Sequence, residues 1–164
     1  MNDRPSTGRT MSTPDDLHLD KSDPGVWKSL NAFVLKVRAA TDATGLPRTL
    51  VELMNVRASQ LNGCAYCLDL HTRQAVEAGE TVQRLAVLPA WRDTSLFSDV
   101  EAAALRVTEA VTSLPDEETR TAELARARES LTDEQYSALA WAAIAINAYN
   151  RVSIVSRHPV RPRP

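Results

Sequence analysis

Residues 50–79 read LVELMNVRASQLNGCAYCLDLHTRQAVEAG, and this stretch decides the fold. Apolar side chains recur at helical spacing before the Asn-Gly pair at 62–63, and the same spacing resumes after it. Glycine readily adopts the left-handed conformation that ends a helix, and Gly79 can end the second periodic stretch in the same way. The sequence therefore predicts a helical hairpin, with helices over 47–62 and 64–78 and a sharp turn between them.

The remainder of the chain also has a helical pattern. Of its 164 residues, 43% are hydrophobic and 24% are charged, and there are only five glycines. This length suits one domain with one core. Apolar periodicity and N-cap residues predict further helices over 24–41, 81–88, 98–114, 118–130 and 132–155. We therefore expect an all-α fold, a compact helical domain of about six to seven helices built round the hairpin.

Composition divides the chain into a helical domain and two terminal segments. Residues 1–22 contain prolines and many short polar side chains, which predict a disordered N-terminal extension. The helical domain is expected over 23–156, and the Pro- and Arg-containing residues 157–164 are expected to form a flexible C-terminal tail. His18 and His158 fall in these two terminal segments and are not counted among the candidate site residues.

Charge and hydropathy argue against several classes of function. A formal net charge of -2 makes nucleic acid an unexpected partner. The first residues lack the apolar core of a secretory signal, and the longest uncharged stretch, 137–150, is shorter than the roughly 20 residues of a membrane-spanning helix. We therefore expect a cytoplasmic protein with no membrane partner. Because residues 137–150 are apolar on almost every side, we expect this helix to lie either at the centre of the bundle or in a subunit interface, and we expect self-association.

Cys64, Cys67 and His71 form a Cys-x-x-Cys-x-x-x-His pattern directly after the turn. At about 100° per residue these positions fall within roughly 60° on one helix face, so the thiols can pair and the imidazole lies one turn beyond. The partial positive charge at a helix N-terminus favours a thiolate, and Cys64 lies nearest to it. For Cys67, His71 four residues later can act as the base. Each thiol thus has an activator, and these residues alone leave open which one attacks.

Glu52 is a carboxylate among apolar residues on the first helix of the hairpin. If the helices fold back at the turn, Glu52 lies about 15 Å from it and His71 about 10.5 Å, at a rise of about 1.5 Å per residue. A glutamate side chain can bridge that offset and hold the imidazole in one tautomer, as the carboxylate of a catalytic triad does. We therefore predict a relay of Glu52, His71, Cys67 and Cys64.

With these four residues in place, the sequence resembles the alkylhydroperoxidase D-like group of the carboxymuconolactone decarboxylase superfamily. The resemblance covers most of the chain, in LMNVRASQLNGCAYCLDLHTRQA at 53–75, GET at 79–81, LPAWR at 88–92 and INAYNR at 146–151. Its most specific element is a glutamate, an eleven-residue gap, Cys-x-x-Cys, a three-residue gap and a histidine. The decarboxylase branch of this superfamily lacks the dithiol, so the resemblance does not imply decarboxylation.

The resemblance implies an all-α, AhpD-like fold and a peroxidase that reduces hydrogen peroxide or alkyl hydroperoxides in antioxidant defence. By that resemblance Cys67 attacks the peroxide and becomes a sulfenic acid, Cys64 closes the disulfide, and Glu52 and His71 relay protons. It further implies a homo-oligomer, a trimer or a hexamer, with no metal or other cofactor. An external dithiol, of lipoyl or thioredoxin-like type, would be the reductant.

Other interpretations of the two cysteines remain open. Some relatives carry a second histidine within Cys-x-x-Cys where this chain has Tyr66, which leaves the reductant undecided. The cysteines, His71 and Glu52 could together hold zinc, although three ligands on one short helix face are unusual for a structural zinc site. The dithiol could also sense redox state by changing partner binding without turnover. Two small buried side chains without reactivity are the simplest alternative.

Overall fold

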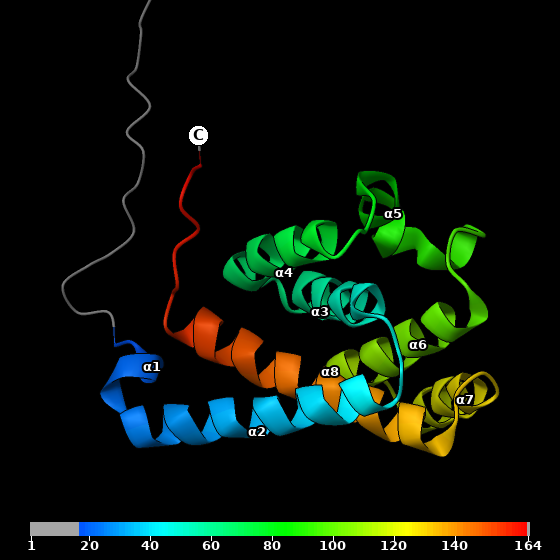
Figure 1. Ribbon diagram of the computed structural model, residues 1–164, viewed down its shortest axis with the longest axis horizontal. Coiled ribbons are helices and arrows are strands. Elements are labelled where there is room, and N and C mark those ends of the chain that lie inside the picture. The colour runs from blue at the N-terminus through cyan, green and yellow to red at the C-terminus, as the bar shows by residue number, and fades with distance from the viewer. Residues whose placement is uncertain (1–16, 164) are drawn as a thin grey trace, which may run out of the picture.

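The computed structural model describes residues 17–163, and that part of the chain is built of helices without strands (Figure 1). The α-helices are α1 (Leu19–Ser22), α2 (Pro24–Ala43), α3 (Arg48–Asn62), α4 (Ala65–Glu77), α5 (Val82–Val87), α6 (Asp99–Ser113), α7 (Glu117–Arg128) and α8 (Asp133–Val155). A 3-10 helix, η1 (Leu88–Asp93), follows α5. α3 packs against α4, α6 and α8 and so lies inside the bundle, with α4 on its outer side.

The all-α class is confirmed, and α2 to α8 correspond to the predicted helices with small shifts at their ends. The predicted number of helices is too low, because α1 forms inside the segment expected to be disordered. Contacts with the distant C-terminal segment hold it: the Leu19 N–H donates to Ser156 Oγ at 3.0 Å, and Asp20 pairs with His158 at 3.2 Å. Residues 1–16 of that prediction lie outside the described residues.

The turn of the hairpin takes the geometry that its glycine predicts. Gly63 has φ 66° and ψ 29°, the left-handed conformation, and ends α3. The Cys64 N–H donates to the Ser59 carbonyl at 3.0 Å, which closes the helix end. Cys64 is then the N-cap of α4, and its Sγ accepts the Cys67 N–H at 3.4 Å. The turn therefore places the first cysteine at the helix N-terminus as a capping residue.

Apolar packing on both sides of α3 buries its polar side chains as well. Leu50 and Met54 join a core with side chains of α2, α6 and α8, while Leu53 and Val56 join a second core with residues of α4, η1 and α6. Glu52 lies on the same helix and is 0% exposed. A buried carboxylate is costly unless it is paired, so the fold itself requires partners for Glu52.

α8 matches the predicted helix over 132–155, but it is longer than the uncharged stretch 137–150 that argued against a membrane-spanning helix. With 23 residues it is long and apolar enough to cross a membrane by length and composition, yet half of its most apolar window is buried against other helices. Contacts with α2, α3 and α6 account for that burial. Burial, rather than insufficient length, supports the interpretation of α8 as a core helix. Its outer face still exposes Trp141 at 49% and Ile144 at 43%.

We expect Gly63→Ala to lower the free energy of unfolding by about 1 kcal/mol, because a Cβ is strained at this positive φ. Gly25→Ala is the matched control, since Gly25 is helical and has open space where a Cβ would lie. It should raise stability by about 0.5 to 1 kcal/mol. Urea unfolding of both variants tests the turn, and equal effects of the two substitutions would contradict it.

Candidate active site

The structure brings Glu52 and His71 together across the hairpin. His71 Nδ1 lies 2.8 Å from Glu52 Oε2, and the Asn55 amide also donates to that oxygen at 3.3 Å. Arg48, one turn earlier on α3, forms an ion pair with the other oxygen, Oε1. Glu52 is thus held by groups from both helices of the hairpin.

These contacts assign the tautomer of His71. An ionised carboxylate only accepts hydrogen bonds, so Nδ1 carries the hydrogen that it donates to Glu52. Nε2 of the neutral ring is then left with its lone pair and can take a proton. The His71 side chain is 15% exposed, whereas Glu52 is fully buried. The carboxylate therefore orients the imidazole from behind and leaves its basic nitrogen for chemistry.

The environment of Glu52 keeps it ionised. Burial acts to raise the pKa of the Glu52 carboxyl, but His71, Arg48 and Asn55 together outweigh it. The hydrogen bond and charge of His71 contribute most, and the pKa lies below its ordinary value. The carboxylate is consequently charged at neutral pH although no part of it meets solvent.

The pKa of the Cys64 thiol is raised, whereas its position at the helix N-terminus predicted that it would be lowered. Burial, together with the hydrogen bond to the Cys67 side chain, raises the pKa of the Cys64 thiol to about 12. The Cys67 N–H and the Ser153 hydroxyl act in the opposite direction and do not compensate. Cys64 is 2% exposed, so the loss of hydration outweighs the field of the helix N-terminus. Cys64 therefore keeps its proton at neutral pH.

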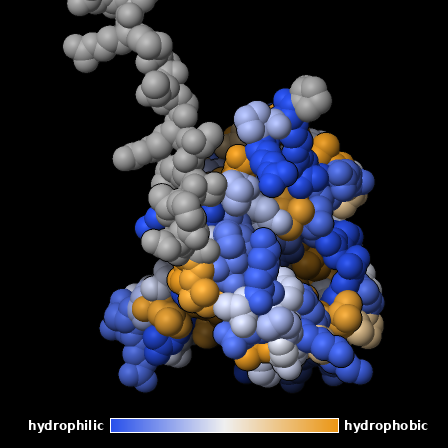
Figure 2. All heavy atoms as spheres, turned by 90° about the vertical axis from the view of Figure 1, so that its left-hand side faces the viewer, coloured by the Kyte–Doolittle hydropathy of each residue, from blue (hydrophilic) through white to orange (hydrophobic). Residues whose placement is uncertain are grey.

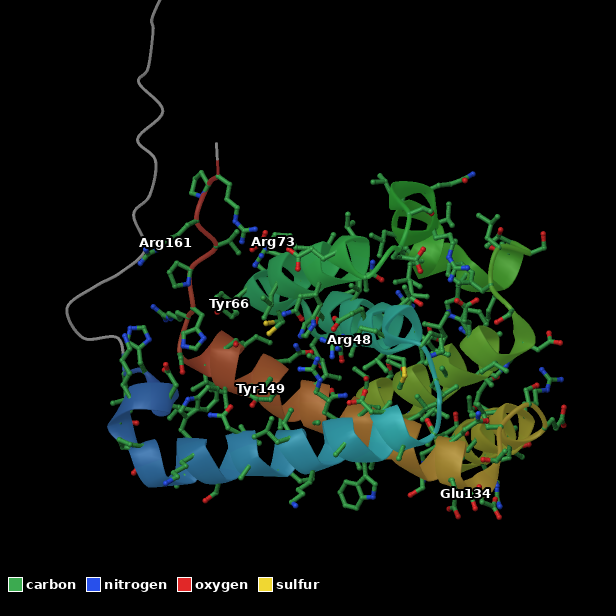
Figure 3. All side chains as sticks on the ribbon, in the orientation of Figure 1. Arg48, Tyr66, Arg73, Glu134, Tyr149 and Arg161 are labelled. Atoms are coloured by element: carbon green, nitrogen blue, oxygen red, sulfur yellow. The ribbon has the colours of Figure 1, made fainter. Side chains whose placement is uncertain are left out.

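Cys67 and His71 line the same cavity of about 290 Å³ between α2, α3, α4 and α8. The wall is largely apolar and includes Val37, Val51 and Ile146. Figure 3 labels three further lining residues from three different helices: Arg48 on α3, Tyr66 on α4 and Tyr149 on α8. Cys64 does not belong to the lining, so the two sulfurs have different access to a small molecule.

Within residues 17–163, the hydrogen bond of His71 goes to Glu52 and not to Cys67, although i and i+4 spacing suggested direct contact. A molecule in the cavity could instead lie between the imidazole and the sulfur. Nor do Glu52, Cys64, Cys67 and His71 converge as metal ligands: in the described chain the His/Cys/Asp/Glu side chains whose ligand atoms all lie within 4.8 Å are His18, Asp20 and His158. The zinc alternative is therefore not favoured at the dithiol.

The trio of His18, Asp20 and His158 is itself better described as hydrogen bonded than as a metal site. His158 Nε2 lies 3.2 Å from Asp20 Oδ1, and His158 Nδ1 lies 3.3 Å from Ser153 Oγ. Both ring nitrogens of His158 are therefore already engaged by protein groups.

Polar side chains of α8 form hydrogen bonds with residues at the turn of the hairpin. These contacts were not predicted from the sequence. The Asn62 amide donates to Asn147 Oδ1 at 2.9 Å and to Asn150 Oδ1 at 2.8 Å, and the Asn150 amide donates to Ser59 Oγ at 3.1 Å. Asn147, Asn150 and Ser153 recur every third residue on an otherwise apolar helix. That spacing is the signal that could have identified them as one polar face directed at the cysteines.

Comparisons with known proteins show a matching family, a relative and a solved structure of similar fold. The sequence profile of the carboxymuconolactone decarboxylase family matches residues 28–110. The uncharacterized protein YdfG of Bacillus subtilis (strain 168) is 40% identical over 122 residues, which cover 74% of this chain and 83% of YdfG. A crystal structure of the Agrobacterium tumefaciens protein ATU0492, of unknown function and with a suggested role as the antioxidant defence protein AhpD, superposes with a TM-score of 0.76. The sequences are 27% identical, and the match covers 89% of this chain and 99% of that one.

We expect Glu52→Gln to destabilise the fold by about 1 to 3 kcal/mol near neutral pH, because charge-assisted bonds to His71 and Arg48 are lost. The pKa of Glu52 is lowered in the folded state, so its contribution is present above the unfolded-state pKa and is lost as pH falls through the folded-state pKa. The difference between wild type and variant should therefore shrink in acid. Urea unfolding at several pH values measures it.

Glu77→Gln serves as the control, because Glu77 is an exposed carboxylate at the end of α4. Its effect should stay within about 0.5 kcal/mol at every pH. A Glu52→Gln penalty that is constant down to strongly acidic pH would contradict the paired, ionised carboxylate.

Proposed function

Because the chain belongs to the carboxymuconolactone decarboxylase family, we propose that it acts with the dithiol chemistry of its AhpD-like members, as a thiol-dependent peroxidase. Hydrogen peroxide or alkyl hydroperoxides would be reduced through a sulfenate and disulfide cycle of Cys67 and Cys64. One observation carries the proposal: Cys67 and His71 line one cavity, with Glu52 orienting His71 and Cys64 adjoining Cys67 outside that cavity. The suggested antioxidant role of the Agrobacterium protein is consistent with it.

In the first step, Cys67 is the nucleophile. His71 Nε2 takes the thiol proton, directly or through the bound peroxide, and the thiolate attacks one peroxide oxygen. The O–O bond breaks, Cys67 is oxidised to the sulfenic acid, and His71 returns the proton to the leaving alkoxide, which departs as an alcohol or as water. Glu52 stabilises the imidazolium that exists between these two transfers.

In the second step, Cys64 resolves the sulfenic acid. Its sulfur bonds to the sulfur of Cys67, the S–O bond breaks, and water leaves with the proton of Cys64. The proton-retaining state of Cys64 supports this order, since a thiol does not compete with Cys67 for the peroxide. An external dithiol, of lipoyl or thioredoxin-like type, would then reduce the disulfide by thiol exchange.

The cavity favours organic hydroperoxides over hydrogen peroxide. At about 290 Å³ it is close to the lower limit for small-molecule sites, and its walls are mostly apolar. Hydrogen peroxide would fill little of that space and make few apolar contacts. An alkyl group would instead displace water from Val37, Val51 and Ile146 while the peroxide oxygens meet Cys67 and His71.

We further propose a cytoplasmic homo-oligomer, a trimer or a hexamer, that needs no metal or other cofactor. Trp141 and Ile144 on the outer face of α8 are apolar side chains available for subunit contact, being 49% and 43% exposed. The chemistry above uses only sulfur, imidazole and carboxylate groups of this chain. No nucleic acid or membrane partner is part of the proposal.

A redox-sensing protein is the second candidate, and burial of the dithiol is the observation that favours it. Cys64 and Cys67 are only 2% and 3% exposed, which restricts access of a protein reductant to the disulfide. In such a protein the disulfide would form once and change partner binding. Repeated turnover with a small dithiol separates the two functions.

Cys67→Ser should lower peroxide consumption with dihydrolipoamide as reductant by more than about 100-fold, because the nucleophile is lost. Cys64→Ser should consume about one equivalent of cumene hydroperoxide and then stop, leaving a sulfenic acid on Cys67 that mass spectrometry detects. Thr72→Ser, a change on α4 outside the cavity lining, is the control and should keep wild-type turnover. Full turnover in both cysteine variants would exclude the peroxidase mechanism, and a single wild-type turnover would favour the sensor.

A further inference from the structure

A second hollow lies beside the cavity that Cys67 and His71 line, and it is formed by α1, α4 and residues 157–163. Its volume of about 650 Å³ is within the range of small-molecule sites. Tyr66 and Leu70 line both spaces, so these two side chains of α4 form the wall between them. The chemistry proposed at Cys67 uses none of the charged groups of the second hollow.

The lining of this second hollow is strongly cationic. Its Lys and Arg side chains come from three segments and are Lys21 of α1, Arg73 of α4, and Arg157, Arg161 and Arg163 of the C-terminal residues. Figure 3 labels Arg73 and Arg161, and Figure 2 views this end of the molecule, where hydrophilic side chains surround smaller apolar patches. This positive charge is gathered in one place although the formal net charge of the whole chain is -2. Such a concave cationic surface attracts anions.

The two acidic side chains of the lining are already engaged within the chain. Asp20 Oδ1 lies 3.2 Å from His158 Nε2. Arg163 donates to Asp69 Oδ2 at 2.6 Å, and Arg73 Nε lies 3.9 Å from the same oxygen, which is too far for a hydrogen bond. These carboxylates therefore reduce the positive charge of the hollow without neutralising all of it.

Several donor groups of the lining have no partner. In the described part of the chain, residues 17–163, the side chains of Lys21 and Arg161 form no ion pair or hydrogen bond. Arg73 Nε and His18 Nδ1 are buried, and they too have no hydrogen-bond partner among those residues. The Nε atom of an arginine always carries a hydrogen, and a buried donor without an acceptor costs free energy. An acceptor from outside the chain would remove that cost at Arg73.

Phosphate is the anion chemistry that fits this lining best. A planar carboxylate can be satisfied by one guanidinium group, whereas a phosphate presents oxygens in several directions to cations from several segments. Arginine supplies N–H donors in a planar fork that matches phosphate oxygens. The volume of the hollow also leaves room for a second phosphate or an organic group beside Tyr66 and His18.

We propose that the second hollow is a binding site for a small soluble phosphate-bearing anion, held by Lys21, Arg73 and Arg161. The ligand would bridge α1, α4 and the C-terminal residues, which come together in the folded chain. Because it binds the folded state, it should also raise the stability of the protein. The site is distinct from the dithiol and does not depend on the proposed peroxidase activity.

Isothermal titration calorimetry of the full chain with pyrophosphate tests this site. We expect saturable one-to-one binding that weakens as sodium chloride is added, because salt screens charges at a partly exposed site. Lys21→Gln and Arg161→Gln should each weaken binding by about 5-fold to 10-fold, since each removes one charged contact. Both side chains are exposed and have no partner within residues 17–163, so these variants should fold as wild type does.

Arg126→Gln is the matched control. It removes one positive charge from an exposed position in the last turn of α7, outside the lining of the hollow, and should bind pyrophosphate as wild type does. Citrate, which carries its charge on planar carboxylates, should bind at least about 10-fold more weakly than pyrophosphate. In thermal unfolding, pyrophosphate should raise the Tm of wild type and Arg126→Gln more than that of Lys21→Gln. The protein should not sediment with vesicles that contain phosphatidylglycerol.

The site is excluded if wild type shows no saturable binding up to about 5 mM pyrophosphate. It is also excluded if Arg126→Gln weakens binding as much as Lys21→Gln and Arg161→Gln, because the effect would then be one of net charge. Citrate binding as tight as that of pyrophosphate would overturn the assignment to phosphate, and sedimentation with the vesicles would assign the cations to a lipid surface. The titration contains no peroxide and no dithiol, so its result is independent of the peroxidase assay.

Discussion

The buried pair of Glu52 and His71 is the interaction on which the arrangement depends. A carboxylate with no exposed surface is tolerated only where opposite charge and hydrogen bonds replace its hydration. His71 can supply them only if α4 folds back along α3, so the pair constrains the hairpin while the hairpin aligns the pair. The same contact leaves Nε2 of His71 available in the cavity that Cys67 also lines. The pair of Glu52 and His71 therefore both stabilises the bundle and orients the imidazole of His71.

Local sequence was sufficient to predict the hairpin, but it was not sufficient to predict the segments that pack around it. Helical periodicity, Gly63 and the rise per residue predicted the turn and the approach of Glu52 to His71, because all of these act within one continuous segment. The short helix α1 could not be predicted in this way. Three of its four residues are polar, and its backbone is held by Ser156, which lies 137 positions away from Leu19. Helix propensity depends on neighbouring residues, so it does not predict a contact between residues so far apart in sequence.

The state of Cys64 shows which of two opposing effects is larger. The field at a helix N-terminus is worth about 0.3 to 1 kcal/mol at an exposed site. Each tenfold change in proton affinity corresponds to about 1.4 kcal/mol, and burial with the Cys67 contact raises the pKa of Cys64 from 9.0 to about 12. Position in the helix was readable from sequence, but burial was not, because it comes from α8 and the segments packed at its end. The predicted activation of Cys64 was wrong for this reason.

In the proposed cycle, burial also determines which thiol reacts first. A thiol that holds its proton is a poor nucleophile toward peroxide, so the proposed oxidation starts at Cys67, the sulfur that lines the cavity. Once that sulfur has become electrophilic, the thiol of Cys64 can bond to it and give up its proton as water leaves. Asn147 and Asn150 lie on one face of α8, and the side-chain oxygens of both accept hydrogen bonds from Asn62 at the turn. One face of α8 therefore holds the turn after which the helix with both cysteines begins.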